Sequence, residues 1–367
     1  MTARSMIDWD LAVATATRLA GPGPEISRPE ADAVVAELRA DANRSTGLVR
    51  DFTGLEARER TAPVLVVDRA GWVQANADSF AELVSPLVAK VRDRRPATGS
   101  AASGVTDAVG SKVTGLEVGG LLGFMSSKVL GQFDPFYDGP GLETGDGPAT
   151  ESSTGRLLLV APNIVHVENE LGVDRTDFRL WVCLHEETHR VQFTAVPWMR
   201  DHVQGEIEGL VGGVDPDPSK MAAALGEAVK RLGDLVRGTD DASLVDLFST
   251  PEQREVMDRL TGVMSLLEGH ADVVMDGVGP SVIPSVEHIR TRFDQRRKGA
   301  GTLDRLLRRL LGLDAKMAQY RDGAAFVRGV VAKVGQEDFN AVWAGPENLP
   351  SKAEIGDPDA WVRRVHG

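Results

Sequence analysis

Cysteine and tyrosine are scarce in this sequence of 367 residues, and basic residues are outnumbered by acidic ones. Its single cysteine, Cys183, cannot form an internal disulfide, which favours a reducing compartment. Asp and Glu number 54 against 41 Lys and Arg. The net charge of −13 argues against a phosphate backbone as the main partner, because such binding depends largely on clustered Lys and Arg. We therefore expect an acidic, soluble surface and no nucleic-acid partner.

A long uninterrupted apolar run is also missing. The most apolar stretch, residues 113–133, contains Glu117 and Lys128 and therefore does not fit a membrane-spanning helix. Residues 1–10 lack the basic segment, the apolar run and the small cleavage-site residues of a secretory signal. The sequence thus predicts a cytoplasmic protein without a membrane partner.

Three glycines in the same stretch, Gly115, Gly119 and Gly123, recur every four residues. Glycines at this spacing give a helix a smooth face, which lets a second helix approach closely. A tight helix contact inside one folded chain is the simpler interpretation, and a face that contacts another copy in a homo-oligomer, or a membrane, is the alternative.

Apolar residues recur at helical spacing through most of the chain, and β-prone runs are short. Residues 8–19 and 28–57 predict two helices separated by a Gly-Pro-Gly-Pro turn. Residues 64–67 fit a small strand or the approach to a helix, and the runs 157–160 and 164–167 predict one strand or a pair of short strands. The expected fold class is mainly α (α+β), with a small β-sheet.

Two later helices contain the residues of chemical interest. The first starts near Asp174 and Asp177, which are suited to cap and charge a helix start, and it ends before Pro197. The second has Pro251 in its first turn, and its apolar stripe ends at Gly277. Both segments combine start signals, helical periodicity and stop signals.

The first of these helices contains the sequence His-Glu-Glu-Thr-His, which begins at His185 and ends at His189. Residues four apart lie on one face of a helix, so both imidazoles can reach one cation while Glu186 projects toward a metal-bound water. Two histidines on a polar surface stripe are the alternative. The apolar residues just before the motif favour a buried position for the histidines. Two buried imidazoles require polar partners or a metal ion.

Catalytic zinc usually takes three protein ligands and keeps a fourth position for water. The residues after His189 lack the third histidine of the metzincin pattern. Glu268 lies among apolar residues of the second helix, where a buried carboxylate needs a cation. His270 is an alternative ligand, although it points away when Glu268 faces inward. Cys183 is another candidate ligand, although its simpler interpretation is a small apolar residue of the core.

This arrangement resembles the site of the glutamate zincins, which are thermolysin-like in design. In that group a glutamate on a second helix completes the metal ligands, and an aspartate four residues later holds a ligand histidine. The resemblance implies Glu268 as third metal ligand and Asp272 as the residue whose hydrogen bond fixes an imidazole tautomer. An ordinary surface role for Asp272 is the alternative.

Further segments extend the resemblance over residues 7–365: GLLGFMSSKVLGQFDPF at 120–136, LLLVAPNIVHVENELG at 157–172 and LGLDAKMAQYRDGAAFV at 311–327. Together they are similar to an actinobacterial family of zincin-like metallopeptidases, which is associated by name with deazaflavin coenzyme biosynthesis. The resemblance implies a zincin-like helical catalytic core with the sheet beside the first motif helix. The interval between His189 and Glu268 is far longer than in thermolysin, so an inserted helical region must bridge it.

These residues predict a zinc-dependent metallohydrolase in which Glu186 is the general base toward a peptide or small amide substrate. His288, Tyr320 and Arg321 are candidates for stabilising the oxyanion, and the sequence does not choose among them. The rival hypothesis is a zinc-stabilised scaffold or pseudoenzyme that acts through protein contacts. A closed structural site would need four protein ligands, and only three are identified.

Along the chain, the composition predicts an amino-terminal, mainly helical part over residues 1–135 and a flexible glycine-rich loop over residues 136–155. Residues 156–367 form the expected zincin-like, metal-binding catalytic part. We expect all three to belong to one compact unit.

Overall fold

The computed structural model describes residues 7–57, 62–93, 101–140, 152–212, 251–298 and 313–367. The chain divides into two compact units. Unit 1 comprises residues 1–200 and 271–298, and unit 2 comprises residues 201–270 and 299–367. The boundaries expected from composition, near residues 135 and 155, both fall inside unit 1.

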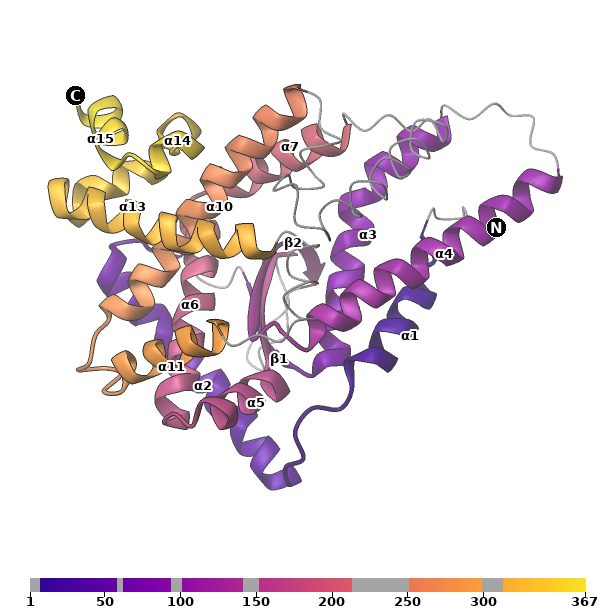
Figure 1. The fold of residues 1–367 in the computed structure, drawn as a ribbon, viewed down its shortest axis with the longest axis horizontal. Coiled ribbons are helices and arrows are strands. Elements are labelled where there is room, and N and C mark those ends of the chain that lie inside the picture. Colours follow the sequence, from indigo (N-terminus) through magenta and orange to yellow (C-terminus); the bar gives the residue numbers. More distant parts are fainter. Residues whose placement is uncertain (1–6, 58–61, 94–100, 141–151, 213–250, 299–312) are drawn as a thin grey trace. The chain divides into compact units, whose positions relative to one another are not determined.

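Among the described residues, unit 1 contains a sheet with the spatial order β1 (Val64–Val67), β3 (Ser152–Val160) and β2 (Gly131–Pro140) (Figure 1). β1 runs parallel to β3, and β2 runs antiparallel to it. The central strand ends in a continuous apolar run because both of its faces are buried. Leu158 and Val160 belong to one hydrophobic cluster, whereas Leu159 belongs to another.

One face of the sheet packs against α1 (Trp9–Ala20), α3 (Arg69–Asp93) and α4 (Ala101–Ser126). α1 and α4 lie side by side, in the close contact that the glycine spacing predicts. A methyl group on Gly119 would lie 2.7 Å from the carbonyl oxygen of Ala12 and 2.8 Å from Cβ of Thr15. The interpretation of the glycines as a helix contact inside one chain is therefore confirmed.

The other face packs against α2 (Arg28–Thr53) and α6 (Arg175–Ala195). These helices form the largest hydrophobic cluster with α5 (Ala161–Leu171), α11 (Val286–Lys298) and the end of α10 (Pro251–Gly277). Trp181 of α6 lies within it, edge-on to Phe293 with 5.2 Å between ring centroids. α6 is thus held between the core and the sheet.

The expectation of a strand at residues 164–167 was wrong, because these residues lie in α5. Pro162 stands in the first turn of α5, and Gly172 ends it with a left-handed φ of 62°. These local start and stop signals outweigh the weak β preference of Ile and Val. The strands expected at residues 64–67 and 157–160 are confirmed as β1 and part of β3.

Unit 2 contains most of α7 (Met199–Gly212) and of α10, followed by α13 (Leu313–Phe339), two 3-10 turns (Asn340–Trp343 and Pro346–Asn348), α14 (Lys352–Ile355) and α15 (Pro358–His366). Gly269 of α10 lies directly against Gly323 of α13. His270 stacks on Phe339 with 5.7 Å between ring centroids. The carboxyl-terminal residues therefore form a core of their own around the first part of α10.

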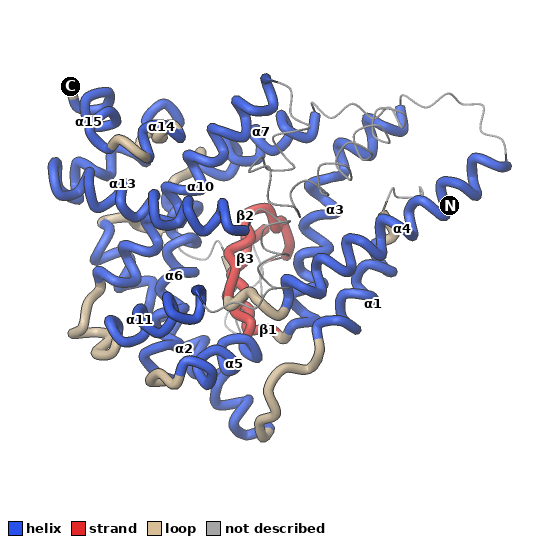
Figure 2. Tube along the Cα trace, viewed as in Figure 1, coloured by secondary structure: helices blue, strands red, loops and turns tan. Residues whose placement is uncertain are grey.

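The expected fold class, mainly α with a small sheet, is confirmed (Figure 2). Within the described part of the chain, no helix is both long and apolar enough to span a bilayer. Residues 136–140 and 152–155 of the expected glycine-rich loop belong to β2 and β3, and residues 141–151 lie outside the described residues. The expected bridging helical region includes α7, but residues 213–250 also lie outside the description.

Candidate metal centre

Local signals fix the position of α6, which carries the His-Glu-Glu-Thr-His motif. The Asp174 side chain caps the helix by accepting a hydrogen bond from the backbone N–H of Asp177 at 2.9 Å. Asp177 in turn accepts hydrogen bonds from the backbone and hydroxyl of Ser285, at 2.8 and 2.6 Å. The predicted cap is confirmed, and the same residues tie the start of α6 to the segment before α11.

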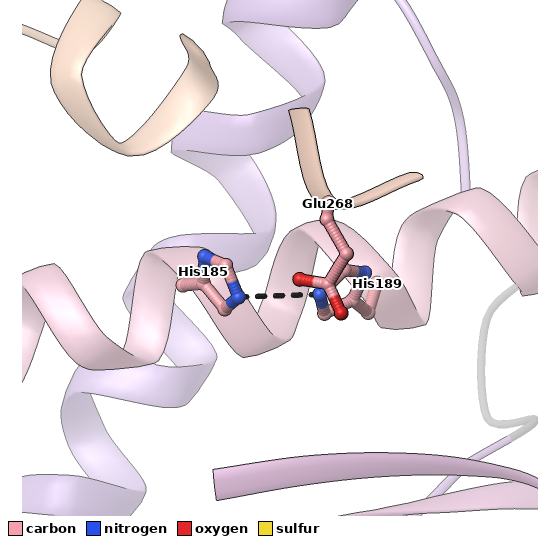
Figure 3. Close-up of side chains that lie close together, drawn as sticks. All are labelled: His185, His189 and Glu268. Atoms are coloured by element: carbon pink, nitrogen blue, oxygen red, sulfur yellow. Dashed lines mark hydrogen bonds between the residues drawn. The ribbon is translucent and has the colours of Figure 1, made fainter. Parts of the chain in front are cut away.

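His185 and His189 point their ring tips at one another from successive turns of α6 (Figure 3). Their Nε2 atoms are 3.2 Å apart, and the two rings are nearly perpendicular at 88°. Two nitrogens bound to one tetrahedral zinc at about 2.0–2.1 Å lie about 3.3 Å apart. The spacing of the two imidazoles therefore suits a shared cation.

Glu268 brings a carboxylate to the same place. Its side chain is 8% exposed, and one of its oxygens, with one nitrogen from each of His185 and His189, forms a set of ligand atoms within 4.8 Å of one another (Figure 3). Glu268 lies three residues before Ala271, where the continuous helix α10 enters unit 1. Two imidazole nitrogens and one carboxylate oxygen form a typical ligand set for catalytic zinc.

The outer nitrogens of the two imidazoles face different kinds of side chain. Nδ1 of His189 lies 2.9 Å from Oε1 of Gln192, one turn further along α6. Nδ1 of His185 lies 3.3 Å from Sδ of Met275, near the end of α10. Gln192 and Met275 are both buried, with exposures of 0% and 3%.

The two consecutive glutamates of the motif have different surroundings. Glu187 is fully buried and forms two hydrogen bonds with Arg190, at 2.6 and 2.8 Å. Glu186 lies on the sheet side, against Gly131 at the start of β2. A methyl group on Gly131 would lie 2.5 Å from Cγ and 2.7 Å from Cδ of Glu186, so a larger residue at this position would require the Glu186 side chain to shift. Glu187 therefore has a structural partner, whereas the backbone of β2 confines Glu186.

Asp272 lies one turn after Glu268, and its Oδ1 accepts hydrogen bonds from Arg290 of α11 at 3.3 and 3.4 Å. Arg290 also bonds Asp276 at 2.7 Å and lies 5.1 Å from the ring centroid of Trp181. Burial lowers the pKa of Arg290, but Asp272 and Asp276 outweigh this and raise it above its ordinary value. Arg290 thus holds the end of α10 against α6.

The other residues considered from sequence lie in different surroundings. Cys183 is buried, and burial followed by the charge of Asp41 raises its thiol pKa well above the ordinary value, which disfavours the thiolate that a metal needs. His270 packs among the rings of Phe339 and Trp343. His288 is exposed on α11. The side chains of Tyr320 and Arg321 lie outside the described residues.

Three residues beside the cluster were missed from the sequence. The spacing could have identified Gln192, three residues after His189, and Met275, seven residues after Glu268, because both intervals return to the same helix face. No such signal marks Gly131. Gly131 is on β2 and contacts Glu186 on α6, a helix that begins more than forty residues later in the sequence.

The chain is similar to a crystal structure from Chloroflexus aurantiacus, described as that of a proposed hydrolase with a novel fold. The two are 32% identical, the similarity covers 98% of this chain and 99% of that chain, and the TM-score is 0.66. No curated protein is significantly similar to the chain. The sequence model of the zincin-like metallopeptidases matches residues 7–362, and the chain therefore belongs to the zincin-like metallopeptidase family.

Proposed function

We propose that this protein is a zinc-dependent metallohydrolase that cleaves peptide or amide bonds, with His185, His189 and Glu268 as zinc ligands. The observation that carries the proposal is the convergence of three ligand atoms, two from α6 and one from α10, within 4.8 Å. Nitrogen and carboxylate donors suit zinc, and three protein ligands leave one position for chemistry. This is the glutamate-zincin design that the sequence resembles.

Zinc bound by these residues supplies a Lewis acid, which polarises a substrate carbonyl and lowers the pKa of water toward about 7. Glu186 is the proposed general base, which takes a proton from the attacking water and passes it to the leaving amine. Its position next to the ligand His185 and its confinement by Gly131 support this role.

Asp272 is proposed to orient a ligand imidazole. The Nδ1 atoms of both imidazoles face Gln192 and Met275, and Asp272 accepts hydrogen bonds from Arg290. We therefore propose that Asp272 acts indirectly, by holding α10 against α6 through Arg290.

The position of β2 supports a peptide over a small amide as substrate. Among the described strands, β2 lies at an edge of the sheet, and its first residue, Gly131, lies against Glu186. An edge strand has unpaired backbone groups, which can bind an extended peptide by adding it as a further strand. We therefore propose an extended peptide as substrate. A cytoplasmic location, a homo-oligomeric state and a link to deazaflavin coenzyme biosynthesis stay predictions of the sequence.

Elemental analysis and cleavage of a broad peptide library, on the same purified samples, test the proposal. The variants are Glu186→Gln and Glu268→Gln, and Glu287→Gln at an exposed position of α11 is the matched control. We expect one zinc per chain in the wild type, in Glu186→Gln and in the control, and less zinc in Glu268→Gln. Cleavage should occur only in the wild type and the control.

The rival scaffold hypothesis predicts a different pattern. A zinc-stabilised scaffold would bind zinc in the wild type without cleaving any peptide, and Glu186→Gln would change nothing measurable. A wild-type protein without zinc would contradict both hypotheses.

A further inference from the structure

We propose that Gln192 and Met275 are positioning residues that fix the tautomers of His189 and His185, so that both Nε2 atoms are ready to bind a metal. The inference rests on the proposed zinc site. It extends that proposal because neither residue belongs to the His-Glu-Glu-Thr-His motif or to the Glu268–Asp272 pair. It concerns how the chain prepares the site before a metal arrives.

The geometry of His189 determines which nitrogen must hold its proton. A neutral imidazole has one N–H donor and one lone pair, and only the lone pair binds a metal. Nε2 of His189 lies 3.2 Å from Nε2 of His185, so both metal-binding atoms point to the same place. For Nε2 to bind, the proton must be on Nδ1, and Nδ1 must donate it to an acceptor.

Gln192 supplies that acceptor for His189. Its Oε1 lies 2.9 Å from Nδ1, within the usual range of a hydrogen bond. The Gln192 side chain is fully buried, and it lies one turn from His189 on the same rigid helix. Burial keeps water from replacing the amide, so its oxygen favours the tautomer with the proton on Nδ1 of His189.

Met275 faces Nδ1 of His185 as Gln192 faces Nδ1 of His189, but its sulfur is a weaker acceptor. Its thioether sulfur lies 3.3 Å from Nδ1 and cannot donate a hydrogen bond, so a hydrogen bond in this contact requires the proton on Nδ1. Met275 is on α10, the helix that carries Glu268, whereas His185 is on α6. The contact therefore links the tautomer of a ligand on α6 to a residue of α10.

The two partners should differ in strength. An amide oxygen is a good acceptor and a thioether sulfur is a weak one, so losing Gln192 should cost more than losing Met275. Removing the partner of a metal-binding histidine typically weakens metal affinity by about 10–100-fold. We expect a loss in that range for Gln192→Leu and a loss of about 10-fold or less for Met275→Leu.

The experiment combines zinc affinity with the tautomers of the metal-free protein. Zinc affinity is measured by competition with a chromophoric chelator, and tautomers are read from long-range proton–nitrogen correlations of the histidine rings at pH 8. The variants are Gln192→Leu, Gln192→Glu and Met275→Leu. Met199→Leu, at a fully buried methionine that begins α7, is the matched control.

The proposal expects Gln192→Glu to bind zinc at least as tightly as the wild type, because a carboxylate is also an acceptor. In the metal-free wild type His189 should hold its proton on Nδ1. In Gln192→Leu it should move toward the Nε2–H form. Met199→Leu should match the wild type in both measurements.

Two outcomes would overturn the proposal. One is a folded Gln192→Leu protein with wild-type zinc affinity, and the other is a Gln192→Glu protein as weak as Gln192→Leu, which would indicate lost packing. If Gln192→Leu does not fold, an Nε2–H form of His189 in the wild type or in Gln192→Glu contradicts it. If the wild type binds no zinc, the proposed function fails, and the tautomers of the metal-free protein still decide whether these residues position the imidazoles.

Discussion

Helix α6 carries two buried polar clusters of different composition. In its first turns, Arg179 forms bidentate hydrogen bonds with Glu168 at 2.6 and 2.9 Å and a further ion pair with Glu37. In its second half, His185 and His189 meet Glu268. The first cluster contains its own cation. The second consists of groups that all offer lone pairs to the same place.

This difference separates a structural cluster from a ligand site. The guanidinium of Arg179 satisfies two carboxylates from α5 and α2, and the three charges hold these helices together without any added ion. Two imidazole nitrogens 3.2 Å apart beside a carboxylate are suited to share an added cation. Removing a residue should therefore affect folding in the first cluster and metal binding in the second.

The largest expected effect on folding is that of Glu168→Gln. Glu168 is 1% exposed, and its loss leaves the buried Arg179 with only Glu37 as a carboxylate partner. Breaking a buried ion pair costs about 3–5 kcal/mol, so urea unfolding of the metal-free protein should show a loss in this range. Glu170→Gln is the control, because the exposed Glu170–Arg296 pair should contribute about 1 kcal/mol or less. Equal losses for the two variants would contradict the assignment.

Asp41 lies beside the Arg179 cluster and should make the stability of the fold depend on pH. One of its oxygens, Oδ2, is buried without a hydrogen-bond partner among the described residues. Burial and the nearby Glu37 raise its pKa from 3.8 to about 6, against the opposing charges of Arg44 and Arg179.

The folded protein therefore holds the Asp41 proton more tightly than the unfolded chain does. The free energy of unfolding should fall as pH rises from about 4 to about 6, by up to about 3 kcal/mol at about 1.4 kcal/mol per pKa unit. In Asp41→Asn this contribution should be absent, which urea unfolding at pH 4.5 and pH 7.5 would measure. If the free energy of unfolding changed by the same amount between pH 4.5 and pH 7.5 in the wild type and in the variant, the assignment would be refuted.

His189→Ala should weaken metal binding and leave the stability of the metal-free fold almost unchanged, in contrast to Glu168→Gln. Without metal, its free energy of unfolding should stay within about 1 kcal/mol of the wild type, since the imidazole belongs to a ligand site and not to a closed ion network. Zinc at one hundred times its Kd should add about 2.7 kcal/mol to the wild type and nothing to the variant. His288→Ala, at an exposed histidine, serves as control. A metal-free His189→Ala protein as unstable as Glu168→Gln would show that the two clusters do not differ.

The smallest effect concerns the space beside Glu186. Gly131→Ala places a methyl group 2.5 Å from Cγ of Glu186, and such overpacking costs about 1–3 kcal/mol. In a Glu186→Ala background the same substitution should cost almost nothing, because the clashing atoms are gone. Gly120→Ala, whose methyl group meets no atom within 4 Å, is the control. A double-mutant cycle of unfolding free energies measures the coupling, and additive losses would exclude the contact.

The sequence predicted those features that depend on local signals. The Asp174 cap lies next to the helix start that it specifies. The glycines at 115, 119 and 123 mark a close-packing face on α4, although their spacing does not identify α1 as the partner. The spacing of His185 and His189 places them on one helix face. The error at residues 164–167 arose because β-branched residues suggested a strand where Pro162 starts a helix.

Other features depend on contacts between distant parts of the chain. Met275 meets His185 across ninety residues, and Gly131 leaves room for Glu186 on another element. The partnership of Asp272 with Arg290 also joins two helices, so a helical pattern in either one could not reveal it. Sequence spacing identifies residues on one face of a helix, but not which faces meet.

X-ray absorption at the zinc edge would test the central claim most directly. Zinc-loaded wild type should show two imidazole ligands and oxygen ligands at about 2.0–2.2 Å, and no sulfur. His189→Ala should lose one imidazole from the spectrum or lose the metal altogether. A wild-type spectrum with sulfur ligands, or one without imidazoles, would contradict the assignment of His185, His189 and Glu268 as the metal site.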